Sequence, residues 1–231
     1  RDESEFGAGE DIPIQIEEEV INETVNDSVE NSPKNKFYIK WSNSYKEAHK
    51  LIYSKESTLE DYKKAENLLL SEYKNVLALY DLGKLYSMEK SGLKDDEKSF
   101  EFYEKALHGF IQIEPKVKKI KPYLQYQIGV MYFKGLGSAI DNQKATEYFE
   151  KSAELGNQYA KRMLALEYIS GENFEYDIKK GISMLTECAD NGDVLACYKL
   201  GKFYLFGTEN IQKDMQKAIQ YLNFSAEQGN E

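Results

Sequence analysis

The sequence is poor in proline and cysteine, and it has no long apolar run. Its 231 residues include four Pro and two Cys, and no apolar stretch approaches the ~20 residues that a membrane-spanning helix needs. Few prolines favour long helices, and no membrane partner is expected. Arg1 stands where an initiator Met would be, and no signal-peptide pattern follows it. We therefore expect a cytoplasmic fragment of a longer protein.

Basic residues are fewer than acidic ones, 30 against 40, and the whole difference lies at the N-terminal end. Residues 1–32 hold 11 Asp/Glu against Arg1 alone, which leaves 29 acidic and 29 basic residues in the rest of the chain. A body without a basic surplus is not expected to bind nucleic acid directly. The composition of residues 1–32 predicts an acidic linker or disordered tail. The alternation of Ile12, Ile14 and Ile16 leaves open an extended peptide that docks on the body or on a partner.

Residues typical of catalytic and metal chemistry are sparse as well. The two histidines, His49 and His108, stand alone in different predicted helix pairs, so a His-rich metal site is not expected. Gly135-Leu136-Gly137 lacks the strand and the further glycines of a phosphate-binding loop. We predict no cofactor, no metal and no catalytic residue, and we interpret the chain as a non-enzyme.

What the chain does have is a period of 36 residues. Four sets of small or aromatic residues recur at this step, and the last set ends with a step of 37. Such a period is typical of a solenoid of helix pairs. Each unit is long enough for two helices. A small residue on the first helix lets the second approach it, a tyrosine follows one turn later, and a glycine stands where each helix ends. The sets are Gly129, Ala165 and Gly201; Tyr132, Tyr168 and Tyr204; Gly135, Gly171 and Gly207; and Gly156, Gly192 and Gly229.

The sequence predicts an all-α fold, a right-handed superhelical solenoid of about five antiparallel helix pairs over residues 33–231. In the first pair, helices are expected from Lys36 to Ser54 and from Ser57 or Thr58 to about Tyr73. The predicted units are a degenerate pair at 36–73, a pair at 76–113, and regular units at 123–156, 157–192 and 193–229. The residues expected to cap the second helices of the regular units are Asp141, Asp177 and Asp214.

The unit that begins at Leu124 resembles the SEL1-like repeat family, which is related to the tetratricopeptide repeats. The likeness covers residues 76–231, although Ala165 and Gly181 depart from the family pattern. It implies a scaffold or adaptor that binds proteins. The residues that carry the resemblance are Ile128-Gly129, Tyr132, Gly135-Leu136-Gly137, Asp141, Lys144-Ala145, Tyr148-Phe149, Ser152-Ala153 and Gly156.

A narrower resemblance connects the chain with the repeat-bearing C-terminal region of mobilisation relaxases from Gram-positive bacteria. It rests on the segments WSNSYKEAHKLIY and LALYDLGKLYS and on the segment from Phe110 through PYLQYQIGVMYFKGLG. It implies a bacterial protein of conjugation, with a catalytic nicking domain upstream of Arg1 and residues 1–32 as the tether. Two isolated histidines cannot supply the metal site of that nicking domain, so its chemistry is not expected in this region.

First helices line the inner groove in tetratricopeptide-like pairs, so aromatic columns on them predict a binding surface. Tyrosine and arginine are the residue types enriched at binding hot spots. We expect an exposed stripe that binds a peptide or protein segment, and packing between repeats is the alternative for any single tyrosine. The predicted partner-binding residues are Tyr80, Tyr126, Arg162 and Tyr198 in one column, and Tyr123 and Tyr159 in the next.

Cys188 and Cys197 flank a predicted corner between two helices, where the Cα separation could suit a disulfide. Secreted, cysteine-rich members of the SEL1-like family bridge this kind of corner. The lack of a secretory signal favours two reduced thiols instead. An oxidised pair would favour an alternative function, a secreted protein that binds an enzyme or a cell-wall fragment. A purely structural spacer is the remaining alternative.

Overall fold

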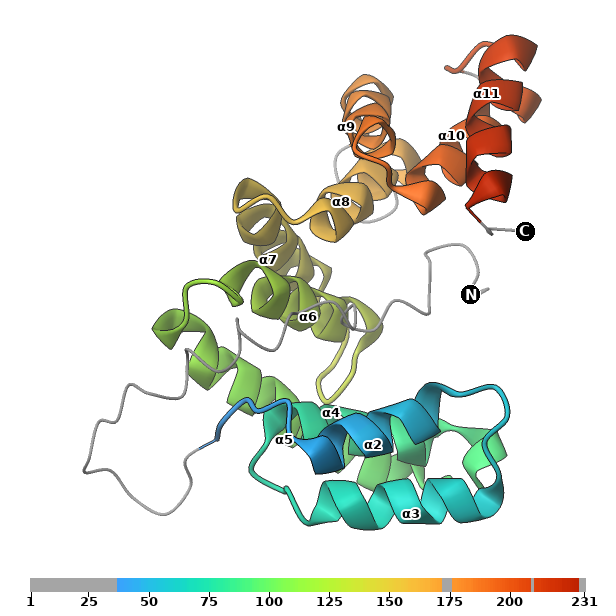
Figure 1. Cartoon of the computed structure of the whole chain (residues 1–231). Coiled ribbons are helices and arrows are strands. Elements are labelled where there is room, and N and C mark those ends of the chain that lie inside the picture. Colours follow the sequence, from blue (N-terminus) through green and yellow to red (C-terminus); the bar gives the residue numbers. More distant parts are fainter. Residues whose placement is uncertain (1–36, 172–175, 209, 229–231) are drawn as a thin grey trace. The chain divides into compact units, whose positions relative to one another are not determined.

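The computed structural model of the chain describes residues 37–171, 176–208 and 210–228. In these residues it has ten α-helices, labelled α2 to α11 in Figure 1, and no strand, so the predicted all-α fold is confirmed. No helix within these ranges is long and apolar enough to cross a membrane. The acidic segment 1–32, with Ile12, Ile14 and Ile16, and the last predicted glycine, Gly229, lie outside the described residues.

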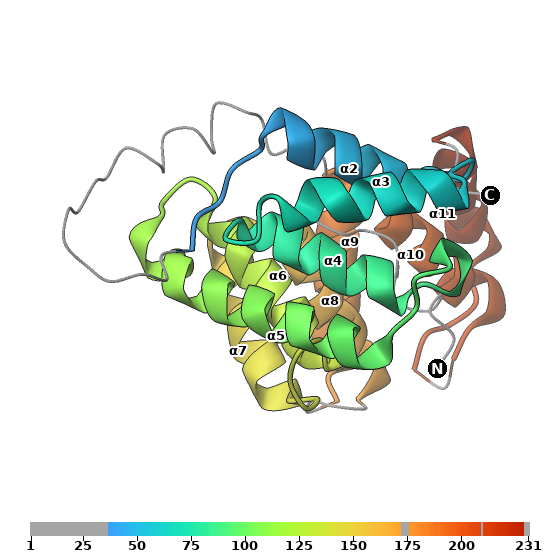
Figure 2. The same ribbon diagram turned by 90° about the horizontal axis from the view of Figure 1, so that it is seen from below.

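The chain divides inside α7 into two compact units, whose described parts are residues 37–145 and 146–228. In the first unit, α2 contacts α3 and α4, and α4 packs against α5; Figure 2 shows these four helices side by side. Its helices are α2 (Asn43–Tyr53), α3 (Leu59–Leu70), α4 (Val76–Ser87), α5 (Asp96–Ile113), α6 (Lys121–Lys134) and the start of α7 (Asn142–Glu154).

The second unit contains two complete helix pairs around one apolar core. Helix α8 packs against α9, α10 packs against α11, and α9 also contacts α10. Leu185 of α9 and Leu200 of α10 are fully buried in this core. Since full burial of a leucine side chain contributes ~1.5–3 kcal/mol, stacking of one pair on the next stabilises both. The helices are α8 (Gln158–Ser170), α9 (Ile178–Asp190), α10 (Val194–Phe206) and α11 (Met215–Glu227).

Helix α2 begins at Asn43, and the predicted start at Lys36 is wrong. The Ser42 hydroxyl accepts a hydrogen bond from the Tyr45 N–H at 3.1 Å, which fixes the first turn. Before this cap the chain is extended, because the Tyr38 N–H donates to the Lys74 carbonyl at 3.1 Å. The sequence pattern did not reveal this pairing, since the aromatic spacing before Ser42 also fits a helix. In α3 the predicted cap is found, as Thr58 forms a capping box with Asp61.

Small residues set the distance between the helices of a pair. At Gly83 of α4, an added Cβ would lie 2.6 Å from the Tyr103 ring of α5, and the Ser99 hydroxyl donates to the Gly83 carbonyl at 2.8 Å. In the α8–α9 pair the glycine lies on the second helix instead of the first. Ala165 stands on α8, and an added Cβ on Gly181 of α9 would lie 2.7 Å from the Ala165 carbonyl oxygen. The two departures from the family pattern therefore compensate each other.

Four helix pairs share one arrangement, here called the repeat corner, of a first-helix tyrosine, the aspartate before the second helix, and a lysine three residues later. In each corner the aspartate N–H donates to the tyrosine carbonyl at 2.9 or 3.0 Å. The lysine ammonium lies between 4.0 and 5.3 Å from the centre of the tyrosine ring. The aspartates predicted to cap helices and the tyrosines predicted to pack between units thus belong to one recurring structural motif. The corners are Tyr86–Asp95–Lys98, Tyr132–Asp141–Lys144, Tyr168–Asp177–Lys180 and Tyr204–Asp214–Lys217.

Candidate partner-binding site

The aromatic column predicted to line an exposed groove is largely buried. Tyr80 and Tyr126 each retain 5% of their exposure. The Tyr80 ring packs edge-on against the rings of Tyr103 and Phe110 of α5, with centroids 5.3 and 6.3 Å away. The predicted exposure of these two tyrosines is therefore not found. First-helix positions that face the second helix and positions that face a groove have the same spacing, so the pattern could not separate them.

Arg162, the third member of that column, is buried as well, with 1% of its surface exposed. Its guanidinium pairs with the Asp193 carboxylate, Nη1 to Oδ2 at 2.5 Å, and lies 5.3 Å from the centre of the Tyr159 ring. A buried charge must be paired to be tolerated. The Arg162 side chain therefore forms its contacts within residues 146–228 and is not exposed to a partner.

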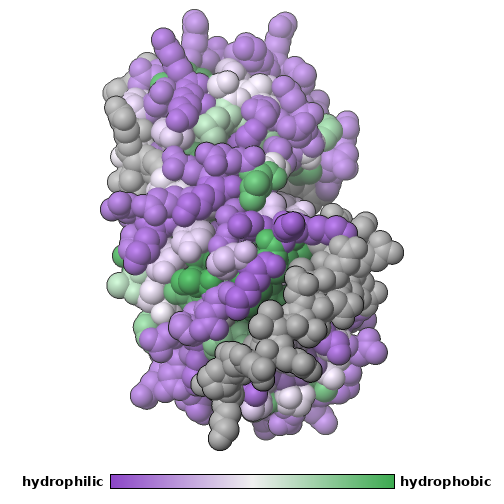
Figure 3. All heavy atoms as spheres, turned by 90° about the vertical axis from the view of Figure 1, so that its left-hand side faces the viewer, coloured by the Kyte–Doolittle hydropathy of each residue, from purple (hydrophilic) through white to green (hydrophobic). Residues whose placement is uncertain are grey.

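The other predicted contact residues, Tyr123, Tyr159 and Tyr198, are half-buried. Tyr198 has the Lys202 ammonium 5.4 Å from its ring centre, and Tyr159 is covered in part by Arg162. On the face drawn in Figure 3, hydrophilic side chains predominate and hydrophobic ones form small separate patches. That these three half-buried tyrosines contact a partner stays a prediction.

Cys188 and Cys197 are free, buried thiols in the structure, and no disulfide joins them. Each sulfur lies 3.8 Å from a backbone carbonyl oxygen, that of Gln158 for Cys188 and that of Ala189 for Cys197. Burial raises the pKa of the Cys188 thiol to about 12, and it raises the pKa of the Cys197 thiol as well. Since the thiolate is the reactive form, both side chains behave as small core residues at neutral pH.

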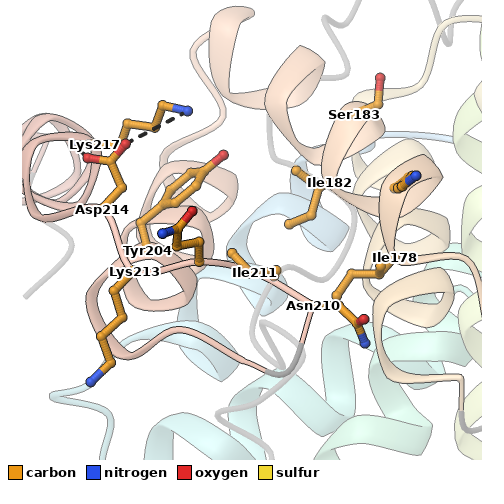
Figure 4. A pocket seen from close by; sticks show the side chains of 11 residues that line it. Ile178, Ile182, Ser183, Tyr204, Asn210, Ile211, Lys213, Asp214 and Lys217 are labelled. Carbon is orange, nitrogen blue, oxygen red and sulfur yellow. Dashed lines mark hydrogen bonds and ion pairs between the residues drawn. The ribbon is translucent and has the colours of Figure 1, made fainter.

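A hollow in residues 146–228 is a better candidate, and we call it the α9–α11 pocket. It has a volume of about 470 Å³. Figure 4 shows Ile178 and Ile182 reaching from α9 toward Ile211 and the ring of Tyr204. The three isoleucines form an apolar floor, and the Tyr204 ring forms a wall beside it. The pocket is lined by Ile178, Lys179, Ile182, Ser183, Tyr204, Asn210, Ile211, Gln212, Lys213, Asp214 and Lys217.

The loop between α10 and α11 forms one wall of this pocket and is held by its own hydrogen bonds. Thr208 and Ile211 exchange backbone hydrogen bonds of 2.9 and 3.3 Å, and the Thr208 hydroxyl accepts from the Ile211 N–H at 3.0 Å. The Asn210 side-chain amide donates to the Tyr176 hydroxyl at 2.7 Å, which ties the loop to the residues before α9. Ile211 is thereby fixed in a buried position on the pocket floor.

Lysines outnumber acidic residues among the described residues that line the pocket. Asp214, the one acidic residue among the described residues of the lining, caps α11 by accepting hydrogen bonds from two backbone N–H groups, and it lies 3.9 Å from the Lys217 ammonium. Its charge is therefore already matched. Lys179 and Lys213 are exposed, and neither forms an ion pair with another described residue. Among the described residues, the rim therefore has two lysines that are in no ion pair.

The equivalent surface of α5 has the opposite character. Counting from the capping aspartate of each helix, Ile178 and Lys179 of α9 stand where α5 has Asp96 and Glu97. Ile182 corresponds to Phe100, an apolar residue in both helices. The exposed surface of α9 is therefore basic where that of α5 is acidic, and this difference is the sequence signal that could have revealed the site.

A second polar cluster, in residues 37–145, also escaped the sequence interpretation. His49 Nδ1 lies 2.7 Å from Asp81 Oδ2 and 3.2 Å from the Tyr45 hydroxyl, and the Tyr53 hydroxyl donates to Asp81 at 3.2 Å. His49 and Asp81 are both buried. Among the described residues, no group of three or more His, Cys, Asp or Glu side chains could hold a metal ion. The cluster joins α2 to α4, which makes it part of the helix packing.

Comparison with known proteins identifies the repeats. The Sel1 repeat model matches residues 76–108, 122–157 and 194–230. A Sel1 repeat protein from Oxalobacter formigenes is 24% identical, with a TM-score of 0.55 over 81% of this chain and 70% of that chain. The protective antigen c5321 from uropathogenic Escherichia coli, a protein with the SLR fold, is 24% identical, with a TM-score of 0.49 over 80% of this chain and 38% of that chain. The immunity protein Pa5087 from Pseudomonas aeruginosa is 25% identical, with a TM-score of 0.48 over 81% of this chain and 65% of that chain.

The match with the Oxalobacter protein confirms the predicted α-solenoid fold, and three helical segments of this chain match the Sel1 repeat model. The α8–α9 pair, residues 158 to 190, lies between the second and third matched segments and outside both. The helix that supplies Ile178 and Ile182 therefore belongs to a helix pair that the Sel1 repeat model does not match.

Proposed function

We propose that this chain of Sel1 repeats is a non-catalytic interaction module, and that a segment of a partner protein binds in its α9–α11 pocket. Sel1 repeat proteins generally act as protein-interaction modules. The observation that carries the proposal is the apolar floor of Ile178, Ile182 and Ile211 inside a charged rim. Protein interfaces combine an apolar centre with a polar rim in the same way.

The size of the pocket supports a peptide as the occupant. Its volume of about 470 Å³ lies within the ~300–1,000 Å³ typical of ligand sites, which is room for one or two side chains and no more. The Tyr204 ring gives one wall a rigid aromatic surface of the type enriched at binding hot spots. A partner is therefore expected to anchor one apolar side chain here and to follow the rim with its neighbours.

A peptide-display selection on the full chain tests this proposal. Random peptides are selected on the wild type and counter-screened on Ile182→Asp, which places a carboxylate on the pocket floor. The matched control is Ile219→Asp, because Ile219 occupies the equivalent position of α11, is 52% exposed and does not line the pocket. Peptides that bind the wild type and Ile219→Asp alike, and bind Ile182→Asp about tenfold or more weakly, are expected, since an unpaired charge on an apolar floor is costly.

Two results would count against the pocket. If every selected peptide bound Ile182→Asp as tightly as the wild type, the binding surface would lie elsewhere on the chain. If the selection enriched nothing on the wild type, the spacer alternative would be favoured. Circular dichroism of both variants checks that helix content is unchanged.

A finer part of the proposal concerns biological context. The segments Trp41–Tyr53 and Leu77–Ser87 support placing this chain in the C-terminal region of a mobilisation relaxase, where the module would recruit transfer machinery in a bacterial cytoplasm. The coding sequence upstream of Arg1 tests this directly. A nicking domain there is the expected result, and a secretory signal there would instead favour the secreted alternative.

A further inference from the structure

We infer that the α9–α11 pocket selects an acidic segment, in which an apolar side chain enters the floor and flanking carboxylates meet Lys179 and Lys213. The inference rests on the proposed function, because it specifies the ligand of the same pocket. It goes further by naming the charge and the anchor of the partner segment.

The first support is that the charged side chains of the rim differ in whether they form ion pairs with other described residues. The Asp214 carboxylate accepts hydrogen bonds from the N–H groups of Gln216 and Lys217 at 3.1 and 3.0 Å, and it lies 3.9 Å from the Lys217 ammonium. The Lys217 ammonium also lies 4.9 Å from the centre of the Tyr204 ring. The charges of Asp214 and Lys217 are therefore already engaged, with each other and with the α11 backbone and the Tyr204 ring.

Lys179 and Lys213 differ from this pair. Within the described ranges neither is in an ion pair, and both line the pocket from different elements, the first turn of α9 and the α10–α11 loop. Figure 4 shows Lys213 extending outward from the loop, away from Ile178 and Ile182. An anionic group that meets the Lys213 ammonium therefore lies beside the apolar floor rather than in it.

The second support is the local contrast with the average charge of the chain. Outside residues 1–32 the sequence has equal numbers of acidic and basic residues, so three lysines and one aspartate among the described lining residues are a local excess of positive charge. The α5 positions equivalent to Ile178 and Lys179 are Asp96 and Glu97. Complementary charge selects partners and speeds their association, and here it favours carboxylates over ammonium groups.

The floor supplies the other half of the specificity. Ile178, Ile182 and Ile211 are partly or fully buried, and they offer no hydrogen-bond donor for a phosphate or a base edge. A polyanion without an apolar group would touch the lysines and leave the isoleucines in contact with water. The geometry therefore favours an acidic peptide with an Ile, Leu or Phe over a nucleic acid.

The test uses the full chain and three fluorescein-labelled peptides of equal length, measured by fluorescence anisotropy. One peptide has a central Ile between pairs of Glu, the second has a central Ser between pairs of Glu, and the third has a central Ile between pairs of Lys. The acidic Ile peptide is expected to bind about tenfold or more tightly than either of the others, because it alone satisfies both the floor and the rim.

A charge-reversed variant provides the decisive comparison. Lys179→Glu with Lys213→Glu is expected to weaken the acidic Ile peptide about tenfold and to strengthen the basic Ile peptide by a similar factor. The matched control is Lys55→Glu with Lys118→Glu, two exposed lysines outside the pocket whose reversal changes net charge equally. This control is expected to leave both affinities within about twofold of the wild type.

The outcomes separate this inference from the proposed function. If display selects pocket-dependent peptides that are neutral or basic, the module stands and the acidic specificity is wrong. If the charge-reversed variant binds the acidic peptide as tightly as the wild type, the lysines do not select the partner. A labelled single-stranded oligonucleotide that binds the wild type tightly, and loses binding in the charge-reversed variant, would overturn the peptide in favour of nucleic acid.

Discussion

The α6–α7 loop in residues 37–145 and the α10–α11 loop in residues 146–228 begin at equivalent glycines and end at equivalent aspartates, but they are built differently. In the first, Gly137 is buried against α5, where an added Cβ would lie 2.2 Å from the Glu104 nitrogen. The second is one residue longer and has no further glycine after Gly207. It pairs with itself through Thr208 and Ile211, and a pocket lies beside it. The closed loop packs against α5 in its own unit, and the open one borders the pocket that we propose as a binding site.

This contrast can be measured because each unit contains its own reporter. The only tryptophan, Trp41, lies in residues 37–145, and both cysteines lie in residues 146–228. Urea unfolding followed by tryptophan fluorescence therefore reports the first unit. Labelling of Cys188 and Cys197 during the same titration reports opening of the second, since both thiols are buried when it is folded. The predictions below use these two signals.

The largest effect is expected at the buried ion pair of the second unit. Asp193→Ala removes the carboxylate that pairs with Arg162 and leaves the buried guanidinium without that charge partner. Breaking a buried pair from one side costs ~3–5 kcal/mol. The urea midpoint reported by thiol labelling should fall accordingly, and the midpoint reported by Trp41 should stay near its wild-type value.

Asp193 also caps α10, because its carboxylate accepts a hydrogen bond from the Ala196 N–H at 2.9 Å. The matched control is Asp177→Ala, which removes the equivalent cap from α9 in the same unit and is expected to cost ~1 kcal/mol. Equal losses in the two variants would show that the Arg162 contact contributes nothing beyond capping. An equal shift of the Trp41 signal would show that the two units unfold as one.

The next effect tests the closed loop of the first unit. Gly137→Ala places a methyl group against the α5 backbone at a residue whose φ is +72°. Overpacking and the left-handed conformation together should cost ~2–4 kcal/mol, seen as a lower urea midpoint by Trp41 fluorescence. In Gly156→Ala the same strain arises with no atom within 4 Å, so a cost of only ~1–2 kcal/mol is expected there. Similar losses in both variants would argue against a steric role for the contact with α5.

Much of this fold was accessible from the sequence because the repeat period records local geometry. Glycines at the ends of first helices adopt positive φ as predicted, +70° at Gly135 and +64° at Gly171. The aspartates before second helices cap them, as at Asp177. The predicted start of α2 was wrong because the extended residues before this helix pair with the segment around Asn75, through Tyr38. A pairing between segments that are distant in the sequence leaves no period in it.

The site was less accessible, for a physical reason. Tyr80 and Tyr198 occupy equivalent positions on first helices, yet Tyr80 is buried against α5 and Tyr198 is half-buried. Periodicity identifies equivalent positions, whereas exposure depends on the neighbours that each position meets. The pocket arises where α9 and the loop before α11 depart from the other repeats, and a search for regular columns passes over such departures.

The smallest effect is expected at the repeat corners, where the two units can be compared residue for residue. The Lys180 ammonium lies 4.0 Å from the centre of the Tyr168 ring and donates to the Tyr168 hydroxyl at 2.7 Å. In the first unit Lys98 lies 5.3 Å from the Tyr86 ring, whose hydroxyl donates instead to Glu66. Exposed cation–π contacts contribute ~0.5–1 kcal/mol. Lys180→Met should therefore lower the thiol-reported free energy of unfolding by that amount, and Lys98→Met should change the Trp41-reported value by less than ~0.5 kcal/mol. If the Lys98 variant lost as much stability as the Lys180 variant, contact distance would not explain the difference between the corners, and the ion pair of Lys98 with Asp95 at 3.4 Å would be the contact to remove next.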